Sequence, residues 1–242
     1  MSTSQKGRAL VTGASTGIGA VYADRLASRG YDLILVARDV ARLESLAQRL
    51  RDTAHVKVEV LPADLADRSQ LARVEQRIVS DEGLSLLVNN AGISLKGTLI
   101  DTPAATIEQL IAINVLAPTL LARAAVGAFA ARGTGGIINL SSVLALAPEM
   151  FDGTYSATKA FVLNLSQGLA REVADKGVRV QAVLPGATRT EIWARSGKDI
   201  DAFPAEWVMD AGDLVDAALV GFDRGETVTV PPLADEGQWE AL

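Results

Sequence analysis

The chain has 242 residues, 49% of them apolar, which is enough to build the core of one large α/β domain or of two small ones. Its 23 basic and 29 acidic residues give a net charge of −6, so no basic surplus is present to bind nucleic acid or anionic lipid. With no cysteine and a single histidine, His55, the chain lacks the residues for disulfides, a thiolate nucleophile or a zinc cluster, and no metal site is expected.

Short strand-like segments alternate with longer helical ones. Apolar and β-branched runs predict strands at 7–12, 31–37, 55–62, 84–92, 135–142, 178–186 and 226–232, with His55 as a solvated residue at a strand edge. Helical periodicity predicts helices at 20–28, 40–51, 70–81, 156–174 and 211–222. This alternation predicts right-handed βαβ units and an α/β fold with a parallel sheet that helices cover on both faces.

No linker, repeat or low-complexity segment divides the chain, so residues 1–242 are expected to form one domain. The segment 188–210 has neither helical nor strand periodicity but carries Trp193, Phe203 and Trp207. An irregular segment with aromatic residues is typical of a loop over a binding site, and equally of a surface loop that packs on its own aromatic rings.

The segment 110–131 is long and apolar enough to cross a membrane. Asn114, Pro118 and Arg123 would each be costly in a bilayer, so we expect a helix buried against the sheet or a partner subunit. No apolar stretch of signal-peptide length precedes Gly13. A cytoplasmic protein without membrane contact is therefore the expectation.

Three glycines, Gly13, Gly17 and Gly19, lie between the first predicted strand and the first predicted helix. Glycines at such a turn let the backbone approach a pyrophosphate, whose charge then lies at the helix N-terminus. The spacing is GxxxGxG, whereas the usual dinucleotide fingerprint is GxGxxG. On its own the loop is thus compatible with a purely structural turn.

The end of the second predicted strand supplies a second signal. A dinucleotide site needs a group there that binds the adenosine ribose, either an acid for a free 2′-hydroxyl or an arginine for a 2′-phosphate. The chain has Ala37 followed by Arg38, whose planar guanidinium suits a phosphate. NADP(H) is therefore favoured over NAD(H), and Asp39 is expected to cap the next helix.

Tyr155 and Lys159 in YSATK lie four residues apart, on one face of a predicted helix. A free tyrosine has a pKa near 10, so proton transfer at neutral pH requires a shift of roughly 3 units, or about 4 kcal/mol. An adjacent ammonium favours the phenolate and would lower the pKa of Tyr155. Tyr155 or Lys159 taken alone is more simply explained as an exposed surface residue. Only their occurrence together with the other motifs favours a catalytic role.

These motifs, in this order, resemble the short-chain dehydrogenase/reductase family, whose single-domain members bind NAD(P)(H) in a Rossmann-type, doubly wound sheet of about seven strands. The resemblance runs from Arg8 to about Pro232. TGASTGIG matches the cofactor loop, NNAG the element after the fourth strand, and PGATRT the family's PGxxxT. The implied cofactor-binding residues are Gly13, Ser15, Thr16, Gly17, Ile18, Gly19, Arg38, Asp64, Leu65, Asn90, Ala91, Gly92, Tyr155, Lys159, Pro185, Gly186, Thr188 and Thr190.

The resemblance also implies a catalytic tetrad of Asn114, Ser142, Tyr155 and Lys159. Ser142 is chosen over its neighbour because the family's serine usually lies thirteen residues before the tyrosine. Two positions depart from the family pattern. Thr16 stands where NADP(H)-dependent members often carry a basic residue, and Ala145 replaces the glycine of SSxxG beside Ser142.

By resemblance, the expected activity is hydride transfer between NADP(H) and a carbonyl/alcohol pair, with Tyr155 as general acid/base. A 3-oxoacyl-thioester reductase is the alternative within the class, and a non-catalytic NADP(H)-sensing or scaffold protein is the alternative outside it. Apolar residues suggest a pocket for a bulky carbonyl, with Ser142, Leu144, Phe151, Tyr155 and Trp193 as substrate contacts. The family commonly dimerises through the two helices matching 110–131 and 156–174, so a homodimer or homotetramer is expected.

Overall fold

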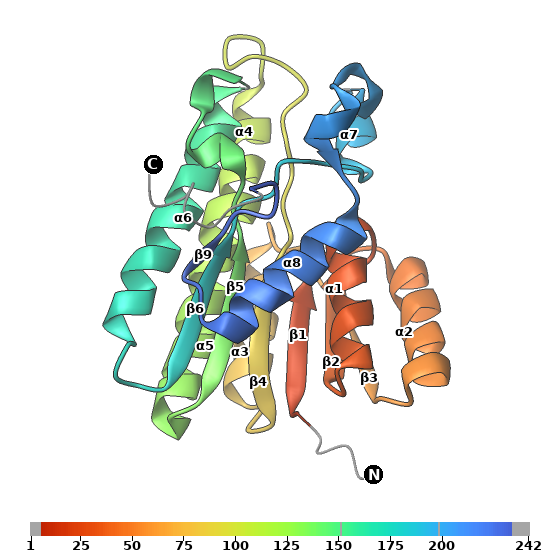
Figure 1. The fold of residues 1–242 in the computed structure, drawn as a ribbon, viewed down its shortest axis with the longest axis vertical. Coiled ribbons are helices and arrows are strands. Elements are labelled where there is room, and N and C mark those ends of the chain that lie inside the picture. Colours follow the sequence, from red (N-terminus) through yellow and green to blue (C-terminus); the bar gives the residue numbers. More distant parts are fainter. Residues whose placement is uncertain (1–5, 151, 198, 234–242) are drawn as a thin grey trace.

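A computed structural model describes residues 6–150, 152–197 and 199–233 of the chain. Its centre is a seven-stranded parallel sheet with strand order β3-β2-β1-β4-β5-β6-β9 (Figure 1). The strands are β1 (Arg8–Thr12), β2 (Asp32–Ala37), β3 (Val58–Pro62), β4 (Leu84–Asn89), β5 (Gly135–Leu140), β6 (Val178–Val183) and β9 (Val228–Thr229). The strand order reverses between β1 and β4, so the sheet is doubly wound, which confirms the predicted fold class.

Helices cover both faces of the sheet (Figure 1). One face carries α1 (Gly17–Ser28), α2 (Val40–Ala54) and α8 (Ala211–Arg224), and the other carries α3 (Arg68–Val79), α5 (Ala117–Arg132) and α6 (Gly153–Glu172). Helix α4 (Ala104–Ile111) lies beyond the ends of the strands (Figure 1). A buried apolar cluster fills each side. Because both faces are covered, strands such as β2 are buried along nearly their whole length, which explains their continuous apolar runs.

Capping side chains decide where several helices begin and end. Asp39 accepts the N–H of Arg42 and begins α2, as expected, and Asp152 accepts the N–H of Tyr155 and begins α6. The prediction of His55 as a strand-edge residue was wrong. His55 instead ends α2 in the left-handed conformation, with φ of 56°, and β3 begins only at Val58.

The apolar segment 110–131 belongs to a helical stretch, Ala104–Arg132, that is long and apolar enough to span a membrane. Half of its most apolar window is buried inside the chain. Leu121, Ala125 and Phe129 have no exposed surface and pack with α3 and the sheet. The stretch is a core helix, which confirms the preference for burial over a membrane span.

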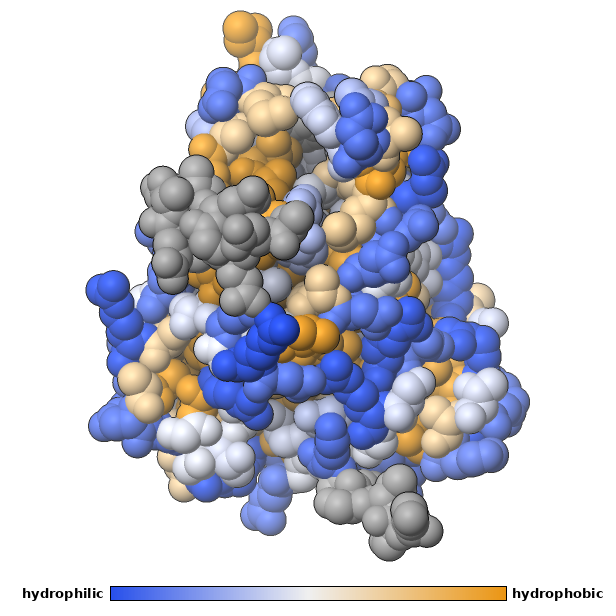
Figure 2. Space-filling view, in the orientation of Figure 1, coloured by the Kyte–Doolittle hydropathy of each residue, from blue (hydrophilic) through white to orange (hydrophobic). Residues whose placement is uncertain are grey.

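The segment 188–210 lies beyond the carboxyl ends of the strands (Figure 1). It begins at the end of β7 (Ala187–Thr188) and continues through α7 (Ile192–Arg195) and two single 3₁₀ turns (Ile200–Ala202 and Ala205–Trp207) to β8 (Val208–Met209), which pairs with β7. Figure 2 shows that the surface is hollowed between this segment and the part of the molecule that holds α4 and the start of α6. Apolar side chains lie on both sides of the hollow.

Candidate active site

A cleft of about 1720 Å³ opens at the carboxyl ends of the strands. Most of the site residues predicted from the sequence line it: Gly13, Ser15, Thr16, Gly17, Ile18, Arg38, Asp64, Leu65, Asn90, Ala91, Gly92, Ser142, Leu144, Tyr155, Lys159, Pro185, Gly186, Thr188, Thr190 and Trp193. Gly19 and Asn114 do not line the cleft, and Phe151 lies outside the described residues.

The glycine loop is tied to the end of β4. Thr12 Oγ1 accepts the N–H groups of Asn90 and Ala91, each at 3.0 Å, and Asn90 Nδ2 donates to the carbonyl oxygens of Thr12 and Gly13. A Cβ on Gly19 would stand 2.3 Å from the carbonyl oxygen of Gly13, so only glycine fits. The loop thus brings bare backbone and the N-terminus of α1 to the cleft, which fits the pyrophosphate of a dinucleotide.

Arg38 and Asp64 line the cleft where β2 and β3 end. The Arg38 side chain is 61% exposed, and its Nη1 lies 3.8 Å from Asp64 Oδ2, a loose ion pair. Asp39 also lines the cleft, with its carboxylate engaged in capping α2. An exposed guanidinium therefore stands where a ribose 2′-phosphate would need one.

Helix α6 turns Tyr155 and Lys159 toward the cleft. Lys159 Nζ lies 5.6 Å from the centroid of the Tyr155 ring and donates to the carbonyl oxygen of Leu140 at 2.9 Å. Ser142, just after β5, forms a side-chain hydrogen bond with Tyr155. Ser141 instead donates to the carbonyl oxygen of Lys159 at 2.7 Å, which holds β5 against α6. The fold thus brings Ser142, rather than Ser141, to the phenol.

Burial is the largest cause of the pKa shifts of Tyr155 and Lys159. It raises the pKa of Tyr155 above its ordinary value, the negative charge of Asp152 adds to the rise, and the hydrogen bond with Ser142 opposes it. Burial also lowers the pKa of Lys159 from 10.5 to about 8, so the ammonium is still mostly protonated at pH 7. The lowering of the Tyr155 pKa expected from the sequence was wrong: the pKa is raised, because burial disfavours the phenolate and the only opposing contribution is the hydrogen bond with Ser142.

The buried Lys159 ammonium should make stability depend on pH in a predictable direction. Its pKa is depressed on folding, so below pH 8 both states are protonated and the folded chain bears the full burial cost. Above pH 8 the folded state releases its proton first, and stability rises. Between pH 8 and pH 10 the free energy of unfolding of the wild type should rise by about 2 kcal/mol relative to Lys159→Met.

Urea unfolding of both proteins without cofactor at the two pH values measures this change. Because both proteins keep their tyrosines, tyrosine ionisation largely cancels in the comparison. A difference between the two proteins that stays constant with pH would show that Lys159 does not titrate in this range.

Asn114 lies in a π-helical turn, Ala112–Leu116, between α4 and α5. Pro118 has no N–H to donate to the carbonyl of residue 114, which favours this widened turn. The Asn114 side chain is buried, accepts the N–H of Ile93 and donates to the Ile93 carbonyl and to Thr158 Oγ1. Its Oδ1 lies 3.5 Å from the point a Cβ on Gly92 would occupy, as does Lys159 Nζ, so the two polar atoms share one corner behind the cleft wall.

Comparison with known proteins identifies the family. A family model described as short chain dehydrogenase matches residues 7–201, which include the glycine loop, the tetrad and the PGATRT segment. The chain belongs to the short-chain dehydrogenase/reductase family. It is an oxidoreductase, as predicted.

Solved structures of other short-chain dehydrogenases are similar over nearly the whole chain. One from Sphingobium yanoikuyae, in complex with NADPH, is 53% identical with a TM-score of 0.94, and the match covers 97% of this chain and 91% of that one. The bulky-bulky ketone specific alcohol dehydrogenase from Comamonas testosteroni is 47% identical with a TM-score of 0.89, covering 97% and 90%. An uncharacterized oxidoreductase from Staphylococcus saprophyticus is 31% identical over 92% of this chain and 93% of its own length.

The outer half of the cleft in this short-chain dehydrogenase is apolar. Trp193 Nε1 donates to the carbonyl oxygen of Thr188 at 2.8 Å, and its ring meets that of Phe203 edge-on at 5.1 Å, so the segment 188–210 is packed on its own aromatic rings. Met150 and Trp207 also line the cleft, yet are 59% and 56% exposed. Met150 was missed by the sequence analysis, because it lies in an irregular loop that no motif marks.

Proposed function

We propose that the chain is an NADP(H)-dependent reductase of bulky, apolar ketones. The observation that carries this proposal is the convergence of Tyr155, Ser142 and Lys159 in one cleft, which the glycine loop and several large apolar side chains also line. Proton donor, hydrogen-bond donor and cation then face the position where a carbonyl oxygen would lie.

NADPH, when bound, supplies the hydride that reduces the carbonyl carbon. Tyr155 donates the proton to the carbonyl oxygen, and the raised pKa of Tyr155 keeps the phenol protonated for that step. Ser142 donates a hydrogen bond to the same oxygen and stabilises its growing negative charge. Lys159 offsets the charge left on the tyrosinate. We assign to Asn114, whose Oδ1 shares a corner with Lys159 Nζ, the placing of a water that would lead from Lys159 to solvent.

We assign the preference for NADP(H) over NAD(H) to Arg38. Its exposed guanidinium at the end of β2 offers two parallel donors to a phosphate, and Ala37 leaves no acid there to bind a free 2′-hydroxyl. The complex of the Sphingobium yanoikuyae relative with NADPH supports this choice. The remaining predicted cofactor residues except Gly19 are assigned to the dinucleotide because they line the same cleft. Gly19 is assigned to the shape of the glycine loop, because a Cβ there would meet the carbonyl oxygen of Gly13.

The substrate class follows from the apolar half of the cleft. Large apolar side chains from three separate segments line it: Ile93, Leu144, Met150, Ile192, Trp193, Phe203 and Trp207. A ketone with large groups on both sides of the carbonyl would cover Met150 and Trp207, which are otherwise exposed to water. The Comamonas testosteroni relative, an alcohol dehydrogenase specific for bulky-bulky ketones, supports a substrate of this kind.

NADPH consumption with a panel of carbonyl compounds tests this function. With bulky diaryl or aryl-alkyl ketones, kcat/KM should exceed that with acetone by roughly 10²-fold, because each additional buried methylene contributes about 0.8 kcal/mol. Trp207→Ala should lose most of this advantage, whereas Val220→Ala, an exposed apolar site on α8 away from the cleft, should keep it. Turnover of 3-oxoacyl thioesters alone would replace this proposal with the thioester reductase.

The remaining assignments concern the whole protein. We propose one domain over residues 1–242, with 188–210 as the substrate segment, in a cytoplasmic homodimer or homotetramer. Ile111, Leu116 and Phe161 on the two helical stretches expected at the interface are 40–46% exposed, which supports self-association. Light scattering should give two or four times the chain mass, and a monomer would refute the assignment.

A further inference from the structure

Arg42 and Glu191 join α2 to the segment that follows β7. Arg42 Nη1 donates to both carboxylate oxygens of Glu191, at 2.9 and 2.8 Å. Arg42 Nε also lies 3.4 Å from Asp39 Oδ2, so the guanidinium is held from two sides. The two paired residues are 149 positions apart in the sequence, so the ion pair links segments that only the fold brings together.

This ion pair lies at the edge of the cleft, beside the glycine loop. Arg38, Asp39 and Glu191 all line the cleft. The methyl carbon of Thr190 lies 3.2 Å from the point that a Cβ on Gly17 would occupy. The chain that leaves β7 therefore crosses the glycine loop and is tied to α2 on its far side.

The charges and the exposure of this ion pair suit a link that holds the segment after β7 in place and can break when a ligand leaves the cleft. Without Arg42, the carboxylate of Glu191 would face the phosphates of a bound dinucleotide, and the two would repel each other. Both side chains are 47% exposed, and ion pairs between exposed groups contribute little free energy. Such a link holds the segment in place but breaks easily enough to let a ligand out.

We propose that the Arg42–Glu191 ion pair is a strap that holds the segment 188–193 over bound NADP(H) and slows its dissociation. Arg42 and Glu191 are positioning residues, since they act through the segment they hold rather than on the reacting atoms. The proposal rests on the proposed function only in its choice of NADP(H) as the ligand.

Stopped-flow displacement of bound NADPH and of bound NADH, followed by nicotinamide fluorescence, measures the dissociation rate of each cofactor and so tests the strap. Arg42→Ala and Glu191→Gln should each raise the dissociation rate by about two- to fivefold, for both cofactors, because an exposed ion pair is worth no more than that. In 0.5 M salt the wild type should approach the single variants, since salt screens exposed charges.

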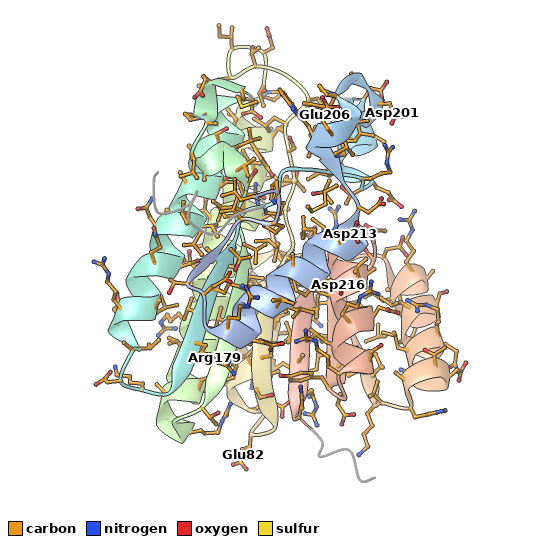
Figure 3. The ribbon with its side chains drawn as sticks, in the orientation of Figure 1. Glu82, Arg179, Asp201, Glu206, Asp213 and Asp216 are labelled. Atoms are coloured by element: carbon orange, nitrogen blue, oxygen red, sulfur yellow. The ribbon has the colours of Figure 1, made fainter. Side chains whose placement is uncertain are left out.

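Arg25→Ala is the matched control. Arg25 pairs with Asp216 at 2.7 and 3.1 Å between α1 and α8, and Asp216 on α8 lies outside the cleft (Figure 3). Its loss should leave both dissociation rates unchanged. An effect of Arg42→Ala on NADPH alone would make Arg42 a phosphate ligand and overturn the strap, as would unchanged rates. A wild-type chain that binds neither cofactor would overturn the proposed function as well.

Discussion

Replacing Tyr155 with Phe is expected to lower kcat for ketone reduction by roughly 10²- to 10⁴-fold, with NADPH affinity nearly unchanged. Phe fills the same volume between Ser142 and Lys159 but has no proton to donate. The growing negative charge on the substrate oxygen would then be met only by the Ser142 hydroxyl. Steady-state kinetics together with a fluorescence titration of NADPH separate the loss of chemistry from a loss of binding.

A wild-type rate in Tyr155→Phe would remove Tyr155 from the mechanism. Thr154→Ala, next to Tyr155 and outside the residues that line the cleft, serves as the control for local changes in α6 and should keep most of the activity. If the wild type itself bound NADPH but reduced no carbonyl compound, the non-catalytic alternative would be favoured. The presence of Tyr155 argues against that alternative, because a protein that only senses the cofactor does not need a proton donor there.

Replacing Arg38 with Ala is expected to weaken NADPH binding by roughly 10- to 100-fold, because hydrogen bonds to a charged group contribute about 1.5–3 kcal/mol. The affinity for NADH, which has no 2′-phosphate, should change little. The loop departs from the family pattern at Thr16, so no basic residue there can replace the guanidinium. Dissociation constants for both cofactors, measured at one salt concentration, check the ratio.

Arg49→Ala is a suitable control for Arg38. Arg49 also lies on the α2 side of the sheet, but it pairs with Asp24 at 2.6 Å and does not line the cleft. Its loss should leave both affinities unchanged. Equal losses of NADPH and NADH affinity in Arg38→Ala would contradict the phosphate assignment and would leave Arg38 with only its ion pair to Asp64.

Much of the fold and most of the cleft are readable from the sequence, because the signals are local. A strand of a parallel sheet is buried on both faces and so appears as a short apolar run, as in β2, and a turn that must pass close to its neighbours needs glycine, as at Gly19. His55 shows the limit of local signals. Its position just before Val56 and Lys57 suits either a strand edge or a helix end, and only the left-handed turn that closes α2 decides between them.

The sequence by itself determined the sheet, the cofactor loop, the arginine at the end of β2 and the spacing of Tyr155 and Lys159. Only the tertiary structure decided how burial shifts both pKa values, that Asn114 holds Ile93, and that Arg42 reaches Glu191. The physical reason is the range of the interactions. Backbone preferences and periodicity act between near neighbours, whereas burial and charge pairing depend on segments that meet only after folding.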